Sequence, residues 1–487
     1  MTKYLYGASV QGIQQFIFQT NELKDIVGAS ELVEFICTRL FKDVVGEKWT
    51  EEKQVISAAG NVKYIFDEKD ECENVVRNFP RKVMTEAPGI TISQAVVELK
   101  EDFTQSINEL EKKLRTQRNK PCKSITTGRL GVQRSPQTGL PITEQNKEKR
   151  YDASTYAKRK HNNLRSLCKK SFGSQVALDK TSIPFDVEKI TGKNDWIAII
   201  HADGNGLGQV VQEIGHHIED FKRFSKELNR ATIAAANNAF QKVSPVDGWN
   251  GAIPIRPIVL GGDDMTVIIR GELAIDYVTE FMHKFEKYSS EGELGLILEK
   301  AGMKRLTACA GVAFIKSSYP FYYGYALAEQ LCKYAKKESA VGTSSLMFHK
   351  VQDSFIKGYE DIKLRELKTV NDNSLCFGPY YLNEGEEKKG YYTIGKLDAL
   401  SRQLIEDKNE GVKTGIRQWL TLMHEDEEKA AQRLKRLKTL NGNKDSMSIV
   451  DALTKGRRLA ENKMAFPAYD VLSFLTIKNQ QTKEESR

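Results

Sequence analysis

Residues 196–208 read WIAIIHADGNGLG, in which an apolar run passes through an aspartate into three glycines at alternate positions. The run from Trp196 to His201 is typical of a buried strand, because it is short, continuous and rich in isoleucine. Residues 208–243 then carry apolar side chains at helical spacing. These residues predict a strand, a glycine-rich turn and a long helix, with Asp203 where the strand ends.

A second acidic turn follows within residues 253–270, where two strand patterns are separated by Gly261-Gly262-Asp263-Asp264. Further along, residues 276–288 are helical, 307–315 strand-like and 323–337 helical. This order, β-α-β-β-α-β, is the ferredoxin-like plan. In that plan the strand ending at Asp203 is a neighbour of the hairpin that carries Asp263 and Asp264. We therefore expect three carboxylates at one edge of a sheet.

Carboxylates in so small a volume raise one another's pKa unless a divalent cation neutralises them. Oxygen-only ligands favour Mg²⁺ or Mn²⁺, and two such ions suit in-line phosphoryl transfer. Glycines at 204, 206 and 208 would let main-chain N–H groups approach a triphosphate. Each turn alone also fits a tight connection without a ligand. Their joint occurrence favours a metal and nucleotide site.

Two lysines end the last helix of this half, at Lys336 and Lys337. Lys336 is placed to reach a γ-phosphate. The same pair also fits two surface lysines that complement the negative end of a helix dipole.

The first hundred residues repeat the same order of elements. Strand patterns cover residues 3–10, 55–59, 62–66 and 90–99, and helical patterns cover 11–42, interrupted at Gly28, and 70–85. Beyond 351 the pattern is mostly helical, over 394–405, 412–437 and 446–455. We therefore predict an α+β chain with two ferredoxin-like domains, at 1–105 and 191–350. A basic, partly helical linker at 106–190 joins them, and a helical region fills 351–487.

The composition is that of a globular chain, with 40% hydrophobic and 28% charged residues among 487. No apolar run reaches the length of a membrane span, and the N-terminus lacks a signal-peptide pattern. The seven cysteines include no Cys-x-x-Cys pair. We expect a cytoplasmic protein without a membrane partner.

Positive charge is concentrated in residues 111–170, which hold 17 Lys and Arg residues but only 4 Asp and Glu. Such a segment attracts phosphates of nucleic acids or nucleotides. It also fits a solvated linker whose charges only keep the chain soluble.

The Gly-Gly-Asp-Asp turn and several short segments of the sequence resemble a known family. Gly-Gly-Asp-Asp in a ferredoxin-like domain resembles the large polymerase/cyclase subunit of type III CRISPR effector complexes. It is similar, more distantly, to GGDEF diguanylate cyclases and minimal CRISPR polymerases. Residues 6–18 (YGASVQGIQQFIF) and 27–32 (VGASEL) resemble the first palm domain of that subunit. Residues 309–313 (CAGVA), 318–320 (SYP), 327–329 (LAE) and 335–336 (AK) resemble the second.

The resemblance, which covers about residues 1–350, implies two palm domains that join ATP into a cyclic oligonucleotide with two Mg²⁺ or Mn²⁺ ions. It makes Asp203, Asp263 and Asp264 the catalytic metal ligands. It assigns nucleotide contacts in the second palm to Gly204, Asn205, Gly206, Gly208, Gly261, Gly262 and Lys336. On the nucleotide-facing edge of the first palm, where the acceptor nucleotide would bind, it places Ser9, Gln11, Gln14, Gly28 and Ser30. Gln11 and Gln14 fit solvent-facing residues at a helix start equally well.

Three departures from the family pattern matter. The chain has no His-Asp dipeptide, the mark of the family's nuclease domain, so we expect no DNA cleavage. Between the palms it keeps only Cys122 where many members carry a zinc-binding cysteine cluster. It is also short for the effector subunit. It is therefore expected to act alone or with a partner other than the usual CRISPR backbone.

The leading hypothesis is a nucleotidyltransferase that makes a cyclic oligonucleotide or dinucleotide messenger in antiphage defence. The alternative is an RNA-binding scaffold subunit of a type III CRISPR complex, and a GTP-using GGDEF-like cyclase is a third. The partners implied are nucleoside triphosphates, guide or target RNA, CRISPR effector subunits and a second copy of this chain.

Overall fold

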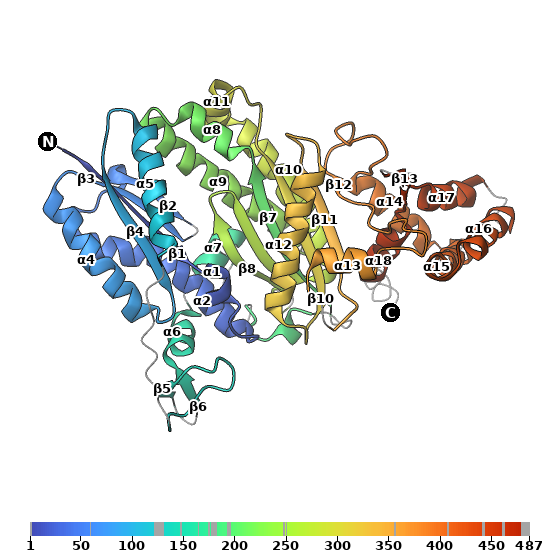
Figure 1. The fold of residues 1–487 in the computed structure, drawn as a ribbon, viewed down its shortest axis with the longest axis horizontal. Helices are drawn as coiled ribbons and strands as arrows, with labels where there is room; N and C mark the ends of the chain where they lie inside the picture. Colours follow the sequence, from blue (N-terminus) through green and yellow to red (C-terminus); the bar gives the residue numbers. More distant parts are fainter. Residues whose placement is uncertain are drawn as a thin grey trace. The chain divides into compact units, whose positions relative to one another are not determined.

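The computed structural model describes residues 2–58, 60–120, 131–146, 149–163, 165–173, 176, 183–191, 196–246, 249, 251–354, 357–406, 409–440, 444–459 and 463–478 (Figure 1). Cys122 lies outside this described part. The chain divides into two compact units. The first contains Met1–Val187, Gly206–Val267 and Lys284–Leu306. The second contains Glu188–Asn205, Ile268–His283 and Thr307–Arg487. Among the described helices, none is both long and apolar enough to cross a membrane.

The first sheet contains four antiparallel strands in the order β2-β3-β1-β4. They are β1 (Tyr4–Gln11), β2 (Gln54–Ala58), β3 (Asn61–Phe66) and β4 (Thr91–Glu98). The chain passes from β1 through α1 (Ile13–Ile17), α2 (Leu23–Phe35) and α3 (Phe41–Val45) to β2, and from β3 through α4 (Lys69–Glu86) to β4. This sheet order confirms the predicted ferredoxin-like plan.

The two faces of this sheet are buried by different helices, because successive side chains of a strand point to opposite sides. On one face Tyr6 stacks on Phe41, with ring centroids 5.9 Å apart, and Phe41 meets Phe79 of α4 at 5.2 Å. On the other face Leu5 belongs to a buried cluster with Leu110 and Leu114 of α5 (Phe103–Arg118). Both faces are therefore part of the core.

Gly28 does not interrupt a helix, contrary to the sequence prediction. Helix α2 runs through it without a break, and the chain leaves helical geometry earlier, between α1 and α2. A Cβ added at Gly28 would lie 1.9 Å from the carbonyl oxygen of Lys158 in α6 (Ala153–His161). The glycine therefore serves the close approach of two helices, which a pattern of local helix breakers does not reveal.

The described parts of the basic segment are largely folded. They form β5 (Ile142–Asn146), β6 (Lys149–Asp152), α6 and α7 (Ser166–Phe172). Arg159 pairs with the fully buried Asp25 at 2.6 Å, and Lys170 pairs with Glu34. The main-chain N–H groups of Ser166 and Leu167 donate to Glu31. Buried carboxylates of α2 thus explain part of the positive charge, because a buried anion needs partners.

The second sheet has six strands in the order β12-β11-β10-β7-β9-β8. They are β7 (Trp196–Asn205), β8 (Ile255–Gly261), β9 (Asp264–Arg270), β10 (Thr307–Lys316), β11 (Ser345–Lys350) and β12 (Tyr380–Tyr381). The part β10-β7-β9-β8 repeats the ferredoxin-like order of the first sheet, as predicted. Strand β11, which the sequence pattern did not reveal, extends it by parallel pairing with β10.

The helices of this half begin with α8 (Leu207–Ile214) and α9 (Ile218–Val243). The sequence predicts one helix over 208–243, but residues 215–217 separate two, since His217 is extended. Helices α10 (Ala274–Ser290) and α11 (Gly292–Lys300) follow β9, and α12 (Phe321–Glu338) follows β10.

The C-terminal region is mainly helical, as predicted. It contains α13 (Tyr359–Arg365), α14 (Ile394–Ile405), α15 (Glu410–Glu425), α16 (Glu427–Leu440), α17 (Lys444–Thr454) and α18 (Ala468–Lys478), with short strands β13 (Arg457–Arg458) and β14 (Met464–Ala465). The single helix predicted over 412–437 is two helices that meet at Asp426. The Asp426 carboxylate accepts a hydrogen bond from the Lys429 N–H at 3.1 Å, which caps α16.

Candidate metal centre

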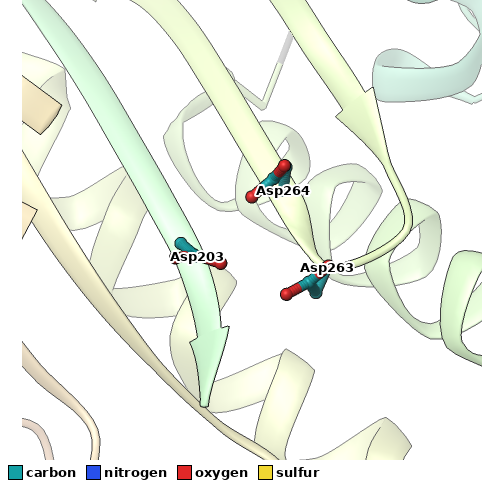
Figure 2. A group of neighbouring side chains, drawn as sticks. All are labelled: Asp203, Asp263 and Asp264. Carbon is teal, nitrogen blue, oxygen red and sulfur yellow. The ribbon is translucent and has the colours of Figure 1, made fainter. Parts of the chain in front are cut away.

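Three carboxylates meet where β7 lies beside the β8–β9 hairpin. Asp203 lies on β7, Asp263 in the hairpin turn and Asp264 at the start of β9. One oxygen from each carboxylate lies within 4.8 Å of the other two, and all three residues are half-buried. Figure 2 shows Asp203 on β7 and Asp263 in the β8–β9 turn pointing toward one another. The convergence expected from the order of elements is therefore present.

Strand β7 runs two residues beyond Asp203, where the sequence pattern predicted its end. Asp203 pairs with Cys309 of β10 and Asn205 with Thr307. The Asn205 amide donates to the Thr307 hydroxyl at 3.1 Å. The turn comes at Gly206, whose φ of +81° suits glycine. The Asn205 hydrogen bond thus fixes the end of the strand. Gly208 lies in the first turn of α8, where an added Cβ would meet nothing within 4 Å.

Helix α9 fixes the Gly-Gly-Asp-Asp turn through two hydrogen bonds to Gly262. The Gly262 N–H donates to the Asn229 side-chain oxygen at 3.3 Å, and the Gly262 carbonyl accepts from the buried Thr232 hydroxyl at 2.6 Å. Gly262 has a φ of +63°. Sequence reasoning missed Asn229 and Thr232. The sequence signal that could have indicated them is weak: they are polar residues three positions apart on an amphipathic helix.

Lys336, in the last turn of α12, brings a positive charge to the cluster. Its ammonium donates to the Asp203 carboxylate and, at 2.8 Å, to the Gly204 carbonyl oxygen. Burial lowers the pKa of Lys336, but the hydrogen bond and charge of Asp203 outweigh it and raise that pKa above its usual range. The side chain is therefore charged at neutral pH. Its neighbour Lys337 is exposed.

His201, which sequence reasoning did not single out, precedes Asp203 by two positions on the same face of β7. Burial lowers the pKa of its imidazole, against the attraction of Asp203. Its ring meets Tyr325 edge-on at 5.7 Å. We expect a neutral imidazole at pH 7.

The residues predicted on the first palm fall into two groups. Ser9 and Gln11 lie together at the end of β1, where the Gln11 amide donates to the Ser9 carbonyl at 3.1 Å. Gln14 is exposed on α1. Gly28 lies under α6, and the buried Ser30 hydroxyl donates to the Ile258 carbonyl of β8. The last two residues therefore make packing contacts between secondary-structure elements.

The carboxylate cluster fits divalent cations by its donor chemistry. It offers hard oxygen donors from three separate positions, and the ammonium of Lys336 offsets the negative charge of Asp203. In the described part of the chain, no other group of three or more acidic, histidine or cysteine side chains has this geometry.

Comparison with known proteins agrees with this architecture. Residues 196–342 match the family model described as Cas10/Cmr2, second palm domain. That segment contains all three carboxylates and Lys336. No curated protein matches the chain.

Solved structures of similar fold cover 98% of this chain. A chain of the Csm1-Csm4 cassette in complex with cA4 has a TM-score of 0.61 at 14% identity, over 70% of its own length. A chain of the cassette in complex with one ATP gives 0.58 at 14% identity, over 69%. Csm1 in T. onnurineus gives 0.54 at 15% identity, also over 69%. Residues 196–342 thus match the second palm domain of the Cas10/Cmr2 family, within a chain that shares its fold with chains of these solved Csm structures.

Proposed function

We propose that this chain joins adenosine nucleotides from ATP into a cyclic oligonucleotide messenger, by metal-dependent phosphoryl transfer in type III CRISPR defence. The observation that carries the proposal is the cluster of Asp203, Asp263 and Asp264 within a second palm domain. Structures of similar fold were solved with cA4, cA3, pppApA and ATP, which supports ATP as substrate and a cyclic oligoadenylate as product.

The three carboxylates would hold one or two divalent cations, Mg²⁺ or Mn²⁺. Bound there, the cations would supply Lewis-acid charge that favours ionisation of a 3′-hydroxyl and stabilises the pyrophosphate leaving group. The task of the chain's own residues is to fix the ligands. Asn229 and Thr232 hold the turn that carries Asp263, and Asn205 holds the strand end beyond Asp203.

Lys336 is proposed to contact the triphosphate. In the structure its ammonium donates hydrogen bonds to the Asp203 carboxylate of the cluster and to the neighbouring Gly204 carbonyl. A polyphosphate beside the cluster would offer that ammonium a stronger anionic partner. The glycines at 204, 206, 208, 261 and 262 leave the surrounding main chain free of side-chain bulk. Ser9, Gln11 and Gln14 are proposed to serve the acceptor nucleotide, whereas Gly28 and Ser30 are the weakest members of the proposed set because of their packing contacts.

The test is to incubate the full chain with each of the four nucleoside triphosphates, singly and mixed, with Mg²⁺ and separately with Mn²⁺, and to identify products by mass spectrometry. A cyclic oligoadenylate is expected, and Asp263→Asn/Asp264→Asn should abolish it. Glu293→Gln/Glu299→Gln, which removes two exposed carboxylates of α11, should leave it unchanged. Product formation by the first variant at the normal rate would refute the mechanism.

A further inference from the structure

A pocket of about 760 Å³ lies at the free edge of the first sheet. Strand β4 ends that sheet and pairs only with β1 among the described strands. The other walls come from α1, α4 and the end of α5. None of the lining residues belongs to the carboxylate cluster. The volume falls within the range of about 300–1,000 Å³ typical of small-ligand clefts.

The lining of this edge pocket is rich in amides and cations. Two exposed cations, Arg118 and Lys120, border it, and neither forms an ion pair within the described residues. No Asp or Glu is present among the described lining residues. Five glutamines line it, namely Gln11, Gln15, Gln19, Gln94 and Gln117. The pocket therefore favours an anionic ligand that also accepts and donates hydrogen bonds.

A buried lysine stands directly behind one wall. The Lys158 side chain is fully buried, and its ammonium donates to the Gln19 side-chain oxygen at 2.9 Å and lies 4.2 Å from the centre of the Phe16 ring. Gln19 and Phe16 both line the pocket. Because Lys158 engages the Gln19 oxygen, the two N–H donors of that amide are left for another acceptor. The positive charge also attracts an anion through the low-polarity wall.

Another wall is both rigid and partly apolar. The Gln94 amide accepts from the Tyr6 hydroxyl at 2.9 Å and donates to the Val76 carbonyl at 2.8 Å, so it is fixed in one orientation. Val76, Pro80 and Ile92 supply apolar surface beside it. The outer backbone groups of β4 add donors and acceptors, as at any sheet edge.

We propose that the edge pocket binds a phosphorylated nucleotide, either free or as part of a single-stranded RNA. Arg118, Lys120 and the Gln19 amide would bind phosphate oxygens. The apolar wall and the remaining glutamines would contact the sugar and base. Gln11 also belongs to the set proposed for the acceptor nucleotide, but the other contacts come from β4, α1, α4, α5 and nearby residues, so the proposal stands whether or not the carboxylate cluster is catalytic.

The test uses the full chain in EDTA, so that metal-dependent binding at the carboxylate cluster does not contribute. The chain is photo-crosslinked with 8-azido-AMP and, separately, with a 4-thiouridine-labelled RNA hexamer, and crosslinked peptides are mapped by mass spectrometry. Affinity for each probe is measured on Arg118→Glu/Lys120→Glu and on the matched control Lys112→Glu/Arg115→Glu. The control reverses two exposed charges of the same helix that do not line the pocket.

We expect crosslinks within residues 11–19 or 91–96, and about tenfold weaker binding by the pocket variant but not by the control. Crosslinking by 8-azido-AMP would identify a free nucleotide as sufficient, and crosslinking by the RNA alone would identify the strand as the ligand. The proposal is overturned if neither probe reaches these residues, or if both charge reversals weaken binding equally.

Discussion

Lys336 donates a hydrogen bond to the carboxylate of Asp203, from the last turn of α12 to a strand 133 positions earlier in the sequence. The same ammonium reaches the Gly204 carbonyl at 2.8 Å. The Asp203 carboxylate is therefore neutralised by the protein itself. A metal ion bound at the proposed site would compete with this lysine for Asp203, whereas a bound triphosphate would attract it.

Replacing Lys336 with methionine should move two affinities in opposite directions. Without the competing ammonium, Mn²⁺ should bind the cluster more tightly, while the KM for ATP should rise about tenfold. Lys336→Arg should keep much of the normal KM, and Lys337→Met, one position along on the exposed face, should change neither value. Mn²⁺ titration and initial rates check this. Parallel losses of both affinities would contradict the assigned role.

Thr232 is predicted to be a positioning residue for the Gly-Gly-Asp-Asp turn. Thr232→Val keeps the shape but removes the hydroxyl that donates to the Gly262 carbonyl at 2.6 Å. We expect kcat to fall about tenfold or more with little change in KM, because small displacements of catalytic groups are costly. Thr232→Ser should restore kcat.

The matched control is Thr454→Val in α17, which also removes a buried hydroxyl bonded to a helix carbonyl, at 2.7 Å. It should have a similar effect on stability and none on kcat. If both valine variants lose kcat equally, the effect of Thr232→Val is one of general stability.

Gly28→Ala should destabilise the first unit. The new Cβ would meet the Lys158 carbonyl, which is main chain and cannot rotate away, so α6 must shift. We expect a loss of about 2 kcal/mol or more in the free energy of unfolding, measured by urea denaturation. Gly411→Ala in α15, where a Cβ meets nothing within 4 Å, should instead be neutral or stabilise by about 0.5 kcal/mol. Equal effects at both positions would contradict the packing role of Gly28.

Asp470 should make stability depend on pH. Burial raises the pKa of its carboxyl to about 7, although the Tyr380 hydroxyl donates to it at 2.8 Å. The folded chain then holds a proton that the unfolded chain releases above its ordinary pKa of about 4. This contribution is complete below pH 4 and is lost as pH rises toward 7, by on the order of 4 kcal/mol.

Calorimetric Tm values between pH 4.5 and 7.5 test that prediction. Asp470→Asn should flatten the downward slope, whatever its effect on the Tm itself. Glu384→Gln, at an exposed carboxyl, should leave the slope as it is. An unchanged slope in Asp470→Asn would show that other groups cause it.

The sequence was sufficient to predict the ferredoxin-like order of both halves and the meeting of Asp203 with Asp263 and Asp264. Strand periodicity and turn residues are local, and the order of elements then determines which strands are neighbours. The partners of the site were not predictable in this way. Asn229 and Thr232 hold a turn some thirty residues away, and the contact of Lys336 with Asp203 depends on how α12 packs.

Two buried elements were not predicted from the sequence, for a different reason. Helix α18 is almost entirely buried, so its apolar residues show no helical stripe, and β11 is a short apolar run of the same kind. Gly28 was misread because a glycine that admits a neighbouring helix has the same local signature as one that ends a helix. Long-range packing, which local patterns do not encode, accounts for each of these errors.

Asp203, Asp263 and Asp264 are proposed to form a divalent metal site. The most direct test is a Mn²⁺ titration of the full chain followed by electron paramagnetic resonance, which requires no activator and no turnover. The wild type and Glu293→Gln/Glu299→Gln should bind Mn²⁺ alike, and Asp263→Asn/Asp264→Asn should lose that binding while remaining folded. Equal Mn²⁺ binding by all three proteins would contradict the claim.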